Sequence, residues 1–173
     1  MYNIKKAQLN DLNDIMIVIN SAKKYLKNQG LSQWNLPNGY PDENALKNDI
    51  LNNNCYILLN KDDIIGTMSI IFTPDENYEE IYDGSWLTNN SYVSIHRIAI
   101  REDYHNKSIG KLMLDLAETI AKENNIKSIK IDTHKDNIPM QKTLIKANYT
   151  RCGVIILKNN PSDKLRDAFE KVL

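Results

Sequence analysis

The chain has 173 residues, of which 42% are hydrophobic and 25% are charged, and its 22 basic residues balance its 22 acidic ones. This length fits one domain with a sizeable core and leaves little room for a second. Because the net charge is zero, the composition argues against a bulk positive field that would hold nucleic acid or an anionic membrane. We therefore expect a single domain, residues 1–173, with any partner bound at a local site.

The N-terminal segment and the cysteines bear on the cellular compartment. The first apolar run, Ile15–Ile19, is short and lies between Asp14 and Asn20, so we expect neither a signal peptide nor a membrane span. Cys55 and Cys152 lie far apart, without CxxC spacing. This spacing favours reduced core thiols in a cytoplasmic protein over a metal site or a disulfide framework.

The N-terminal part of the chain predicts a strand, two helices and a hairpin. The expected order is a strand at Tyr2–Lys5, a helix from Leu12 to Gly30 capped by Asn10 or Asp11, a helix at Glu43–Leu51, and the strands "CYILLN" and "DIIGTMSIIF" joined at Lys61 and Asp62. The helical spacing before Gly30 is carried by Leu12, Ile15, Ile19, Ala22 and Leu26.

The C-terminal part predicts alternating strands and helices. The polar and acidic segment 73–91 precedes a central strand, "YVSIHRIAI", at 92–100. A helix is then expected at Ile109–Glu123, a strand at "SIKID", a helix at Pro139–Lys146, and a terminal strand or strand pair at "YTRCGVIIL". This alternation implies parallel pairing in the middle of a mixed sheet.

The segment "YHNKSIGKLML" can bind an anion where it enters the helix. The apolar stripe of this helix comprises Ile109, Leu112, Met113, Leu116, Ile120 and Ala121. Gly110 lies in the first turn, after His105, Lys107 and Ser108, where free backbone N–H groups and the helix dipole favour a pyrophosphate. A P-loop would need a glycine at His105, and a Rossmann fingerprint would need one at Ser108. An ordinary helix start with solvated lysines is the alternative.

The segment from Ser94 to Tyr149 resembles the GCN5-related N-acetyltransferase (GNAT) superfamily. The family's acetyl-CoA signature, [Q/R]xxGx[G/A] after a strand similar to "RIAI", stands here as His105, Ser108 and Gly110. Its later segment, an Asn before a helix that ends in a "KxGF"-like turn, stands as Asn137, Lys146, Asn148 and Tyr149. The resemblance implies a single-domain α/β fold: a mixed, mostly antiparallel sheet with a central parallel strand pair splayed to admit acetyl-CoA, flanked by about four helices.

Two positions of the signature differ from the family pattern. We expect Ser108 to be tolerated in ordinary helical geometry, with a hydroxyl that caps the helix or donates to a phosphate. His105 keeps a donor but is fully charged only when protonated, and Lys107 and Lys111 can compensate.

The resemblance also implies roles for individual residues. It places the acetyl-CoA contacts at Ile98, Ala99, Ile100, His105, Asn106, Lys107, Ser108, Ile109, Gly110, Lys111 and Asn137. The backbone N–H near Ile98 would stabilise the oxyanion. His96 is the candidate base, because strand alternation would put it on the face of Ile98 and because arylalkylamine acetyltransferases are similar here. His134 competes for this role, and for each histidine a packed or surface position is the alternative. Asn137 could instead cap the helix that follows it.

Other residues bear on the acid and on the acceptor. The Tyr that many members use to protonate the leaving thiolate is replaced by Leu144, and Tyr149 matches an aromatic that is usually in the core. Trp34 and His134 are candidates for binding the acceptor, and Trp34 could equally be a core aromatic. For the acidic stretch from Asp75 to Asp83 we favour a solvated loop over an acceptor site.

The function implied is that of a cytoplasmic N-acetyltransferase, which moves an acetyl group directly from acetyl-CoA to a primary amine of a small molecule or a protein. No metal, nucleic acid or membrane is expected to take part. The alternative is a catalytically weakened or inactive CoA-binding regulatory module of the same fold, which the changes at Ser108, His105 and Leu144 favour. The tail "LRDAFEKVL" could pack on the domain or on a second copy in a homodimer.

Overall fold

The computed structural model describes residues 2–160 and 163–173. The chain forms two compact units. Unit 1 comprises the residues up to Ile70 together with Arg97–Met113, and unit 2 comprises Ile71–His96 together with Leu114–Leu173. The central strand β4 (Tyr92–Ile100) and the helix α3 (Ile109–Glu123) each contribute residues to both units.

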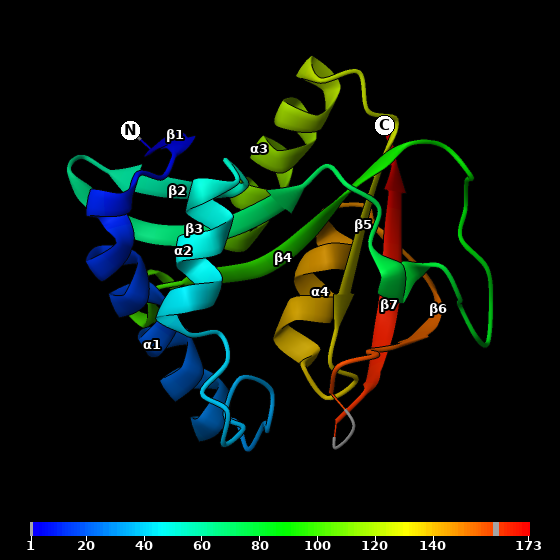
Figure 1. Cartoon of the computed structure of the whole chain (residues 1–173), viewed down its shortest axis with the longest axis horizontal. Helices are drawn as coiled ribbons and strands as arrows, with labels where there is room; N and C mark the ends of the chain where they lie inside the picture. Colours follow the sequence, from blue (N-terminus) through cyan, green and yellow to red (C-terminus); the bar gives the residue numbers. More distant parts are fainter. Residues whose placement is uncertain (1, 161–162) are drawn as a thin grey trace. The chain divides into compact units, whose positions relative to one another are not determined.

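Unit 1 is a three-stranded antiparallel sheet with two helices packed on it (Figure 1). Its elements are β1 (Tyr2–Lys6), α1 (Leu12–Asn28), α2 (Glu43–Leu51), β2 (Cys55–Asn60) and β3 (Asp63–Ile71). The apolar stripe of α1, which includes Ile15, Val18 and Ile19, is fully buried against residues such as Leu46 and Ile57. Burial of this stripe holds the helices on the sheet, as its 3.6-residue period predicts.

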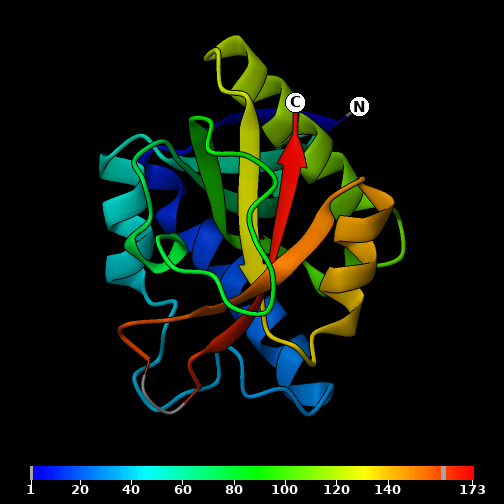
Figure 2. The ribbon, with the colours of Figure 1, turned by 90° about the vertical axis from the view of Figure 1, so that its right-hand side faces the viewer.

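Unit 2 contains the other antiparallel strands, the helix α4 and most of α3. Its elements are β5 (Ser128–Thr133), α4 (Ile138–Lys146), β6 (Thr150–Ile156) and β7 (Leu165–Val172). The strand β7 pairs antiparallel with both β5 and β6, and Figure 2 shows β5 and β7 running side by side in opposite directions. The tail therefore packs on its own domain, with Phe169 buried between these neighbours.

The strand β4 connects the two sets of strands. In unit 2 it pairs in parallel with β5, from Tyr92 opposite Ser128 to Ile95 opposite Ile131. In unit 1 the N–H of Arg101, just after the strand, donates to the carbonyl of Ile65 in β3 at 2.9 Å. The strand order is β1-β2-β3-β4-β5-β7-β6. The predicted α/β fold, with a mixed sheet, one parallel pair and four helices, is confirmed.

Most predicted elements are confirmed to within a few residues. The expectation of a terminal strand or strand pair at "YTRCGVIIL" is wrong, because this segment forms the single strand β6 and the last strand, β7, lies in the tail. Two details of the helices are also wrong. The buried face of α3 includes Leu114 and Ala117, whereas Leu112 and Leu116 of the predicted stripe are only half-buried. At the start of α1, the carboxylate of Asp11 accepts from the N–H of Gln8 rather than from a helix N–H group.

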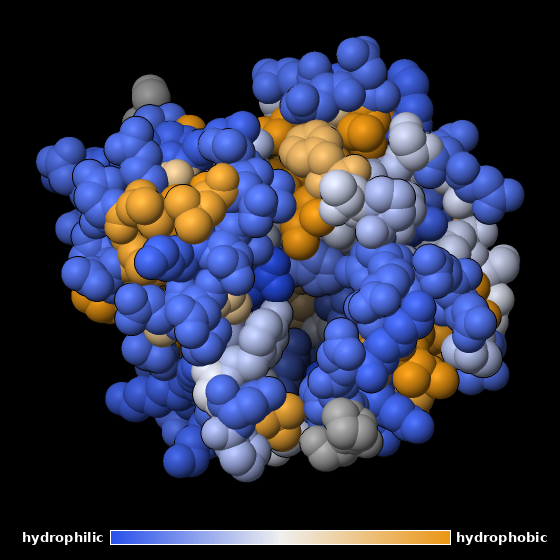
Figure 3. All heavy atoms as spheres, viewed as in Figure 1, coloured by the Kyte–Doolittle hydropathy of each residue, from blue (hydrophilic) through white to orange (hydrophobic). Residues whose placement is uncertain are grey.

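The surface of the described residues is mostly hydrophilic. Figure 3 shows hydrophobic atoms in separate patches on the face turned to the viewer. The most exposed large hydrophobic residues, Ile17, Leu51 and Ile145, lie on three different helices, α1, α2 and α4. Scattered apolar residues of this kind are normal on a protein surface. None of the helices formed by residues 2–160 and 163–173 has the length and apolar character of a membrane span.

Candidate functional site

The turn between β4 and α3 contains two non-glycine residues in the left-handed region of backbone conformation. Asn106 has φ 62° and Ser108 has φ 58°. The expectation that Ser108 would take ordinary helical geometry is therefore wrong, because the turn requires a left-handed residue at the position where the family pattern has glycine. This conformation costs a non-glycine residue about 1–2 kcal/mol, although Asn tolerates it better than most.

The start of α3 leaves backbone donors free. The first bond of the helix runs from the N–H of Leu112 to the carbonyl of Ser108, at 3.0 Å. The N–H groups of Ile109 and Gly110 make no hydrogen bond with any residue that the structure describes. Asn106, Lys107 and Ser108 are exposed to solvent. Free N–H groups after left-handed residues, at the positive end of a helix dipole, form a concave site suited to an anion.

His105 anchors this turn to the rest of unit 1. One of its ring nitrogens, Nε2, lies 3.3 Å from the carbonyl oxygen of Ile100, and the ring meets the edge of the Tyr25 ring with centroids 4.3 Å apart. The imidazole is therefore held by α1 and by the end of β4. Its predicted contact with a phosphate group stays a prediction.

Lys107 supplies a positive charge beside the turn. Its Nζ atom lies 4.7 Å from the centroid of the Tyr104 ring, in a cation–π contact. The hydroxyl of Tyr104 accepts a hydrogen bond from Nδ2 of Asn60 at 3.0 Å. The aromatic ring is thus fixed to unit 1 and holds the ammonium group of this turn residue in place.

A backbone irregularity interrupts β4 just before this turn. Arg97 has φ 50°, which turns the strand locally as a bulge does. The pairing of β4 with β5 ends at Ile95 and Ile131, although β4 continues to Ile100. The alternation from which we predicted that His96 and Ile98 share a face does not hold here, since a left-handed residue lies between them.

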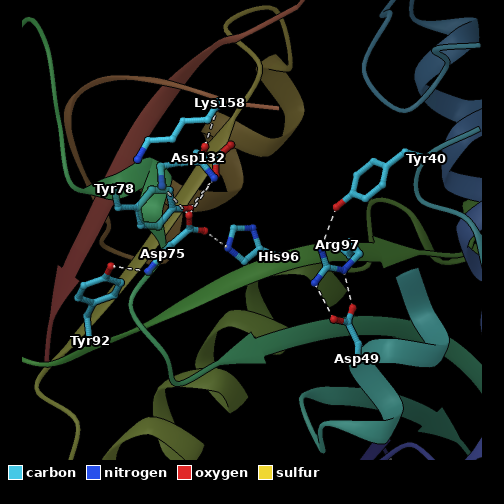
Figure 4. A network of polar contacts seen from close by, with 10 residues as sticks. Tyr40, Asp49, Asp75, Tyr78, Tyr92, His96, Arg97, Asp132 and Lys158 are labelled. Carbon is cyan, nitrogen blue, oxygen red and sulfur yellow. Dashed lines mark hydrogen bonds and ion pairs between the residues drawn. The ribbon is translucent and has the colours of Figure 1, made fainter. Parts of the chain in front are cut away.

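The side chain of Arg97 makes a bidentate ion pair within unit 1 (Figure 4). Its Nε atom lies 2.5 Å from Oδ2 of Asp49 in α2, and Nη2 lies 2.8 Å from Oδ1. Its Nη1 atom donates to the hydroxyl of Tyr40 at 2.8 Å. Burial disfavours the charged guanidinium, but Tyr40 and Asp49 outweigh it, so the pKa of Arg97 is raised above its usual value. The arginine therefore stays charged.

In unit 2, His96 contacts an acidic side chain from the segment before β4 (Figure 4). Nε2 of His96 lies 2.9 Å from Oδ2 of Asp75, as a charge contact rather than a well-directed hydrogen bond. Burial alone would raise the pKa of Asp75, but His96 and the donors of Asn77 outweigh it and lower the pKa to about 2. The preference for a solvated loop is therefore wrong at Asp75, whereas Glu76 and Glu79 are exposed.

Two tyrosines complete this polar cluster. The hydroxyl of Tyr78 donates to Oδ1 of Asp132 at 2.7 Å, and its ring lies 6.0 Å from the His96 ring. Burial, followed by the charge of Asp132, raises the pKa of Tyr78 well above its usual value, so this phenol stays protonated. The hydroxyl of Tyr92 accepts from the N–H of Asp75 at 3.0 Å. Asp75 is thus fixed through both its main chain and its side chain.

Residues 19–149 match the model of the acetyltransferase (GNAT) family. This match covers well over half of the sequence. The chain belongs to the GNAT family. No curated protein matches the sequence.

Solved structures of GNAT proteins have the same fold as this family member. A GNAT-family acetyltransferase from Streptococcus agalactiae has a TM-score of 0.89 and 29% identity, with 99% of this chain and 95% of the other covered. One from Listeria monocytogenes has a TM-score of 0.76 and 19% identity, with 99% and 95% covered. The PaiA N-acetyltransferase from Thermoplasma acidophilum, solved in complex with coenzyme A, has a TM-score of 0.68 and 17% identity, with 100% and 99% covered. The last two show the fold alone.

Two further residues that the GNAT resemblance singled out have structural roles in unit 2. Asn137 caps α4, where its Oδ1 atom accepts from the N–H of Met140 at 3.2 Å, so the capping role is confirmed. His134 uses both ring nitrogens: Nδ1 accepts from the N–H of Asp136 at 3.1 Å, and Nε2 lies 3.1 Å from Oδ1 of Asp163. With both nitrogens engaged, His134 is a poorer candidate for the base than His96.

Three residues considered for the acid or the acceptor lie in or against a core: Leu144, Tyr149 and Trp34. Leu144, where many members have the acid Tyr, is completely buried. Tyr149 is also buried, its hydroxyl has no partner among the described residues, and burial raises its pKa far above the usual value. Trp34 packs against the core of unit 1, which supports the core alternative for this residue.

The described residues contain no group of three His, Cys, Asp or Glu side chains that could hold a metal ion. Both cysteines are free and buried. Burial, the largest influence, raises the pKa of Cys55 to about 11, so its thiol stays protonated and unreactive.

Proposed function

We propose that this GNAT protein is an acetyl-CoA-dependent N-acetyltransferase that acts on a primary amine of a small molecule or a protein. The observation that carries the proposal is the turn before α3, where left-handed Asn106 and Ser108 precede the free N–H groups of Ile109 and Gly110. These groups, with Lys107 beside them, fit the anionic pyrophosphate of a CoA molecule. The neighbour solved with coenzyme A supports this use of the fold.

The residues of β4 before this turn fit the next part of the substrate. Acetyl-CoA, when bound, supplies an activated acetyl thioester. We assign the backbone of Ile98, Ala99 and Ile100 to its extended arm, because a strand can pair with an added chain. The N–H of Ile98 would stabilise the negative charge that develops on the acyl oxygen, an effect typically worth about 3–4 kcal/mol.

His96 is the proposed base. Its Nε2 atom faces the carboxylate of Asp75, so Nδ1 is the nitrogen that can take a proton from the ammonium form of the acceptor, directly or through water. Asp75 stays ionised because its pKa is lowered to about 2, by contacts with His96 and Asn77 that outweigh burial. Its negative charge would orient the ring and stabilise the imidazolium.

The leaving thiolate has no obvious acid in this chain. Leu144 has no proton to give, and the hydroxyl of Tyr149 is buried. A thiol has a pKa of about 8.5, so a thiolate can leave near neutral pH without full protonation. The same feature favours the second candidate function, a regulatory module that binds CoA and transfers acetyl groups slowly or not at all.

Kinetics across a panel of amines separates these two functions. We expect at least one amine to accelerate thiol release from acetyl-CoA, and His96→Ala to lower kcat by about 100-fold with little change in acetyl-CoA affinity, as for loss of a general base. Acetyl-CoA binding without thiol release for any amine would favour the regulatory module. Equal kcat in wild type and His96→Ala at all pH values would remove His96 from the mechanism.

A further inference from the structure

Arg97 has an unusual backbone conformation for its place in the fold. Of the described non-glycine residues with positive φ, the others lie in turns, bends and loops, whereas Arg97 lies inside the strand β4. The left-handed conformation is unfavourable for a residue with a side chain, whereas glycine adopts it freely. Contacts elsewhere in unit 1 must therefore hold Arg97 in this state.

One such contact is the ion pair with Asp49. The guanidinium and the carboxylate meet through two parallel contacts, of 2.5 and 2.8 Å, and both side chains are nearly buried. Bidentate geometry fixes the position and the plane of the guanidinium more strictly than a single contact would.

Asp49 is itself held in place from a second element. The hydroxyl of Ser69 in β3 donates to its Oδ2 atom at 2.6 Å, and Ser69 is completely buried. On the other side of the pair, the hydroxyl of Tyr40 accepts from Arg97 at 2.8 Å. Tyr40 and Asp49 thus fix the guanidinium directly, and Ser69, from a distant part of the sequence, fixes Asp49. Fixing the end group of Arg97 also restrains its backbone.

We propose that Asp49 is a positioning residue, which holds Arg97 in the left-handed conformation and so directs the backbone N–H of Ile98. The peptide unit between residues 97 and 98 carries this N–H, and its orientation follows from the backbone dihedrals of Arg97. If Arg97 returned to ordinary strand geometry, that peptide unit would rotate and its N–H would no longer point toward the acyl oxygen. The inference rests on the proposed function, in which the N–H of Ile98 stabilises the acyl oxygen.

Two double variants test this inference without leaving an unpaired ion in the core. Asp49→Asn combined with Arg97→Gly and Asp49→Asn combined with Arg97→Ala both remove the two charges. Glycine accepts positive φ and alanine does not. We expect the glycine variant to have a kcat about 10-fold or more above the alanine variant, with acetyl-CoA dissociation constants within about twofold, because misdirected catalytic groups cost rates of this order. Equal kcat values would overturn the proposal.

A matched control tests whether the contact of Asp49 with Arg97, here called the clamp, differs from an ordinary ion pair. Arg151 and Asp167 form a pair at 2.6 Å between β6 and β7, with Arg151 half-exposed, so Asp167→Asn should keep wild-type kcat. The single variant Asp49→Asn should lower kcat, because Arg97 loses the contact that holds its backbone. An equal loss of kcat in Asp167→Asn would also overturn the proposal, because the loss would then not be specific to the bulge at Arg97.

A readout independent of activity distinguishes failure of the clamp from failure of the proposed function. The three-bond HN–Hα coupling of residue 97, measured by NMR, reports its φ. We expect this coupling to change from its wild-type value in Asp49→Asn and not in Asp167→Asn. An unchanged coupling in Asp49→Asn refutes the clamp even if no amine is acetylated, whereas an inactive wild type with a changed coupling refutes only the proposed function.

Discussion

Replacement of Ser108 by glycine tests the backbone geometry of the anion-binding turn. At φ 58°, serine is in a conformation that costs a non-glycine residue about 1–2 kcal/mol. Glycine removes this cost, but the greater freedom of the unfolded chain opposes the gain by about 0.5–1 kcal/mol. We expect Ser108→Gly to raise the free energy of unfolding by about 0.5–1 kcal/mol, which in a chain of this size raises the melting temperature by about 1–4 °C.

Two controls isolate the backbone effect in urea unfolding. Ser32 is exposed and is not left-handed, so Ser32→Gly should lower the free energy of unfolding by about 0.5–1 kcal/mol. Ser108→Ala removes the same hydroxyl and keeps the left-handed cost, so it should bring no gain. If Ser108→Gly destabilised the protein as much as Ser32→Gly, the left-handed geometry of the turn would be refuted.

Three other changes probe separate parts of the account. Gly110→Asp adds a negative charge at the free N–H groups. It should abolish acetyl-CoA binding in calorimetry and leave the circular dichroism spectrum unchanged. Retained affinity for acetyl-CoA would refute the proposed position of the pyrophosphate. Asp75 has a pKa of about 2, because contacts with His96 outweigh burial, so its stabilising contribution is present above about pH 4 and is lost as pH falls toward 2. Asp75→Asn should therefore flatten the fall in stability over this pH range, and an unchanged acid transition would contradict the contact. A Cβ at Gly66 would lie 2.8 Å from Sδ of Met113 and 3.3 Å from the carbonyl oxygen of Ala99. Gly66→Ala should therefore lower the free energy of unfolding by about 1–3 kcal/mol in urea. An unchanged free energy of unfolding would contradict this packing.

The elements of the fold could be predicted because their signals are local. The helices α1 and α2 carry apolar residues at helical spacing, β3 and β4 are rich in β-branched residues, and β2 is a short, mostly apolar run. The position of α3 followed from its apolar stripe, and the parallel pair followed from the order of strands and helices. Each of these patterns involves only residues close together in the chain, so a single sequence is enough to detect it.

The site was less predictable, because its contacts join residues that are far apart in the chain. Asp49 and Arg97 are 48 residues apart, and Asp75 lies in a polar segment whose composition resembles that of any solvated loop. A single sequence offers no signal for the contact of Asp49 with Arg97 or for that of Asp75 with His96. The left-handed conformation of Ser108 did have a sequence signal, because the family pattern has glycine at this position and glycine often marks a left-handed residue.

The bulge in β4 breaks the strand alternation on which the predicted face of His96 depended. Alternation holds only while every residue of the strand is extended, and Arg97 is not. The ion pair that accompanies this conformation is invisible in the local pattern "IHRIAI".

Thiol release from acetyl-CoA, measured with wild type and Gly110→Asp across a panel of primary amines, tests the central claim most directly. We expect amine-dependent release by the wild type with at least one amine, and release at the uncatalysed rate by Gly110→Asp. Amine-dependent release that is equal in the two proteins would contradict the role of the turn before α3, and no release by the wild type with any amine would contradict acetyl transfer itself.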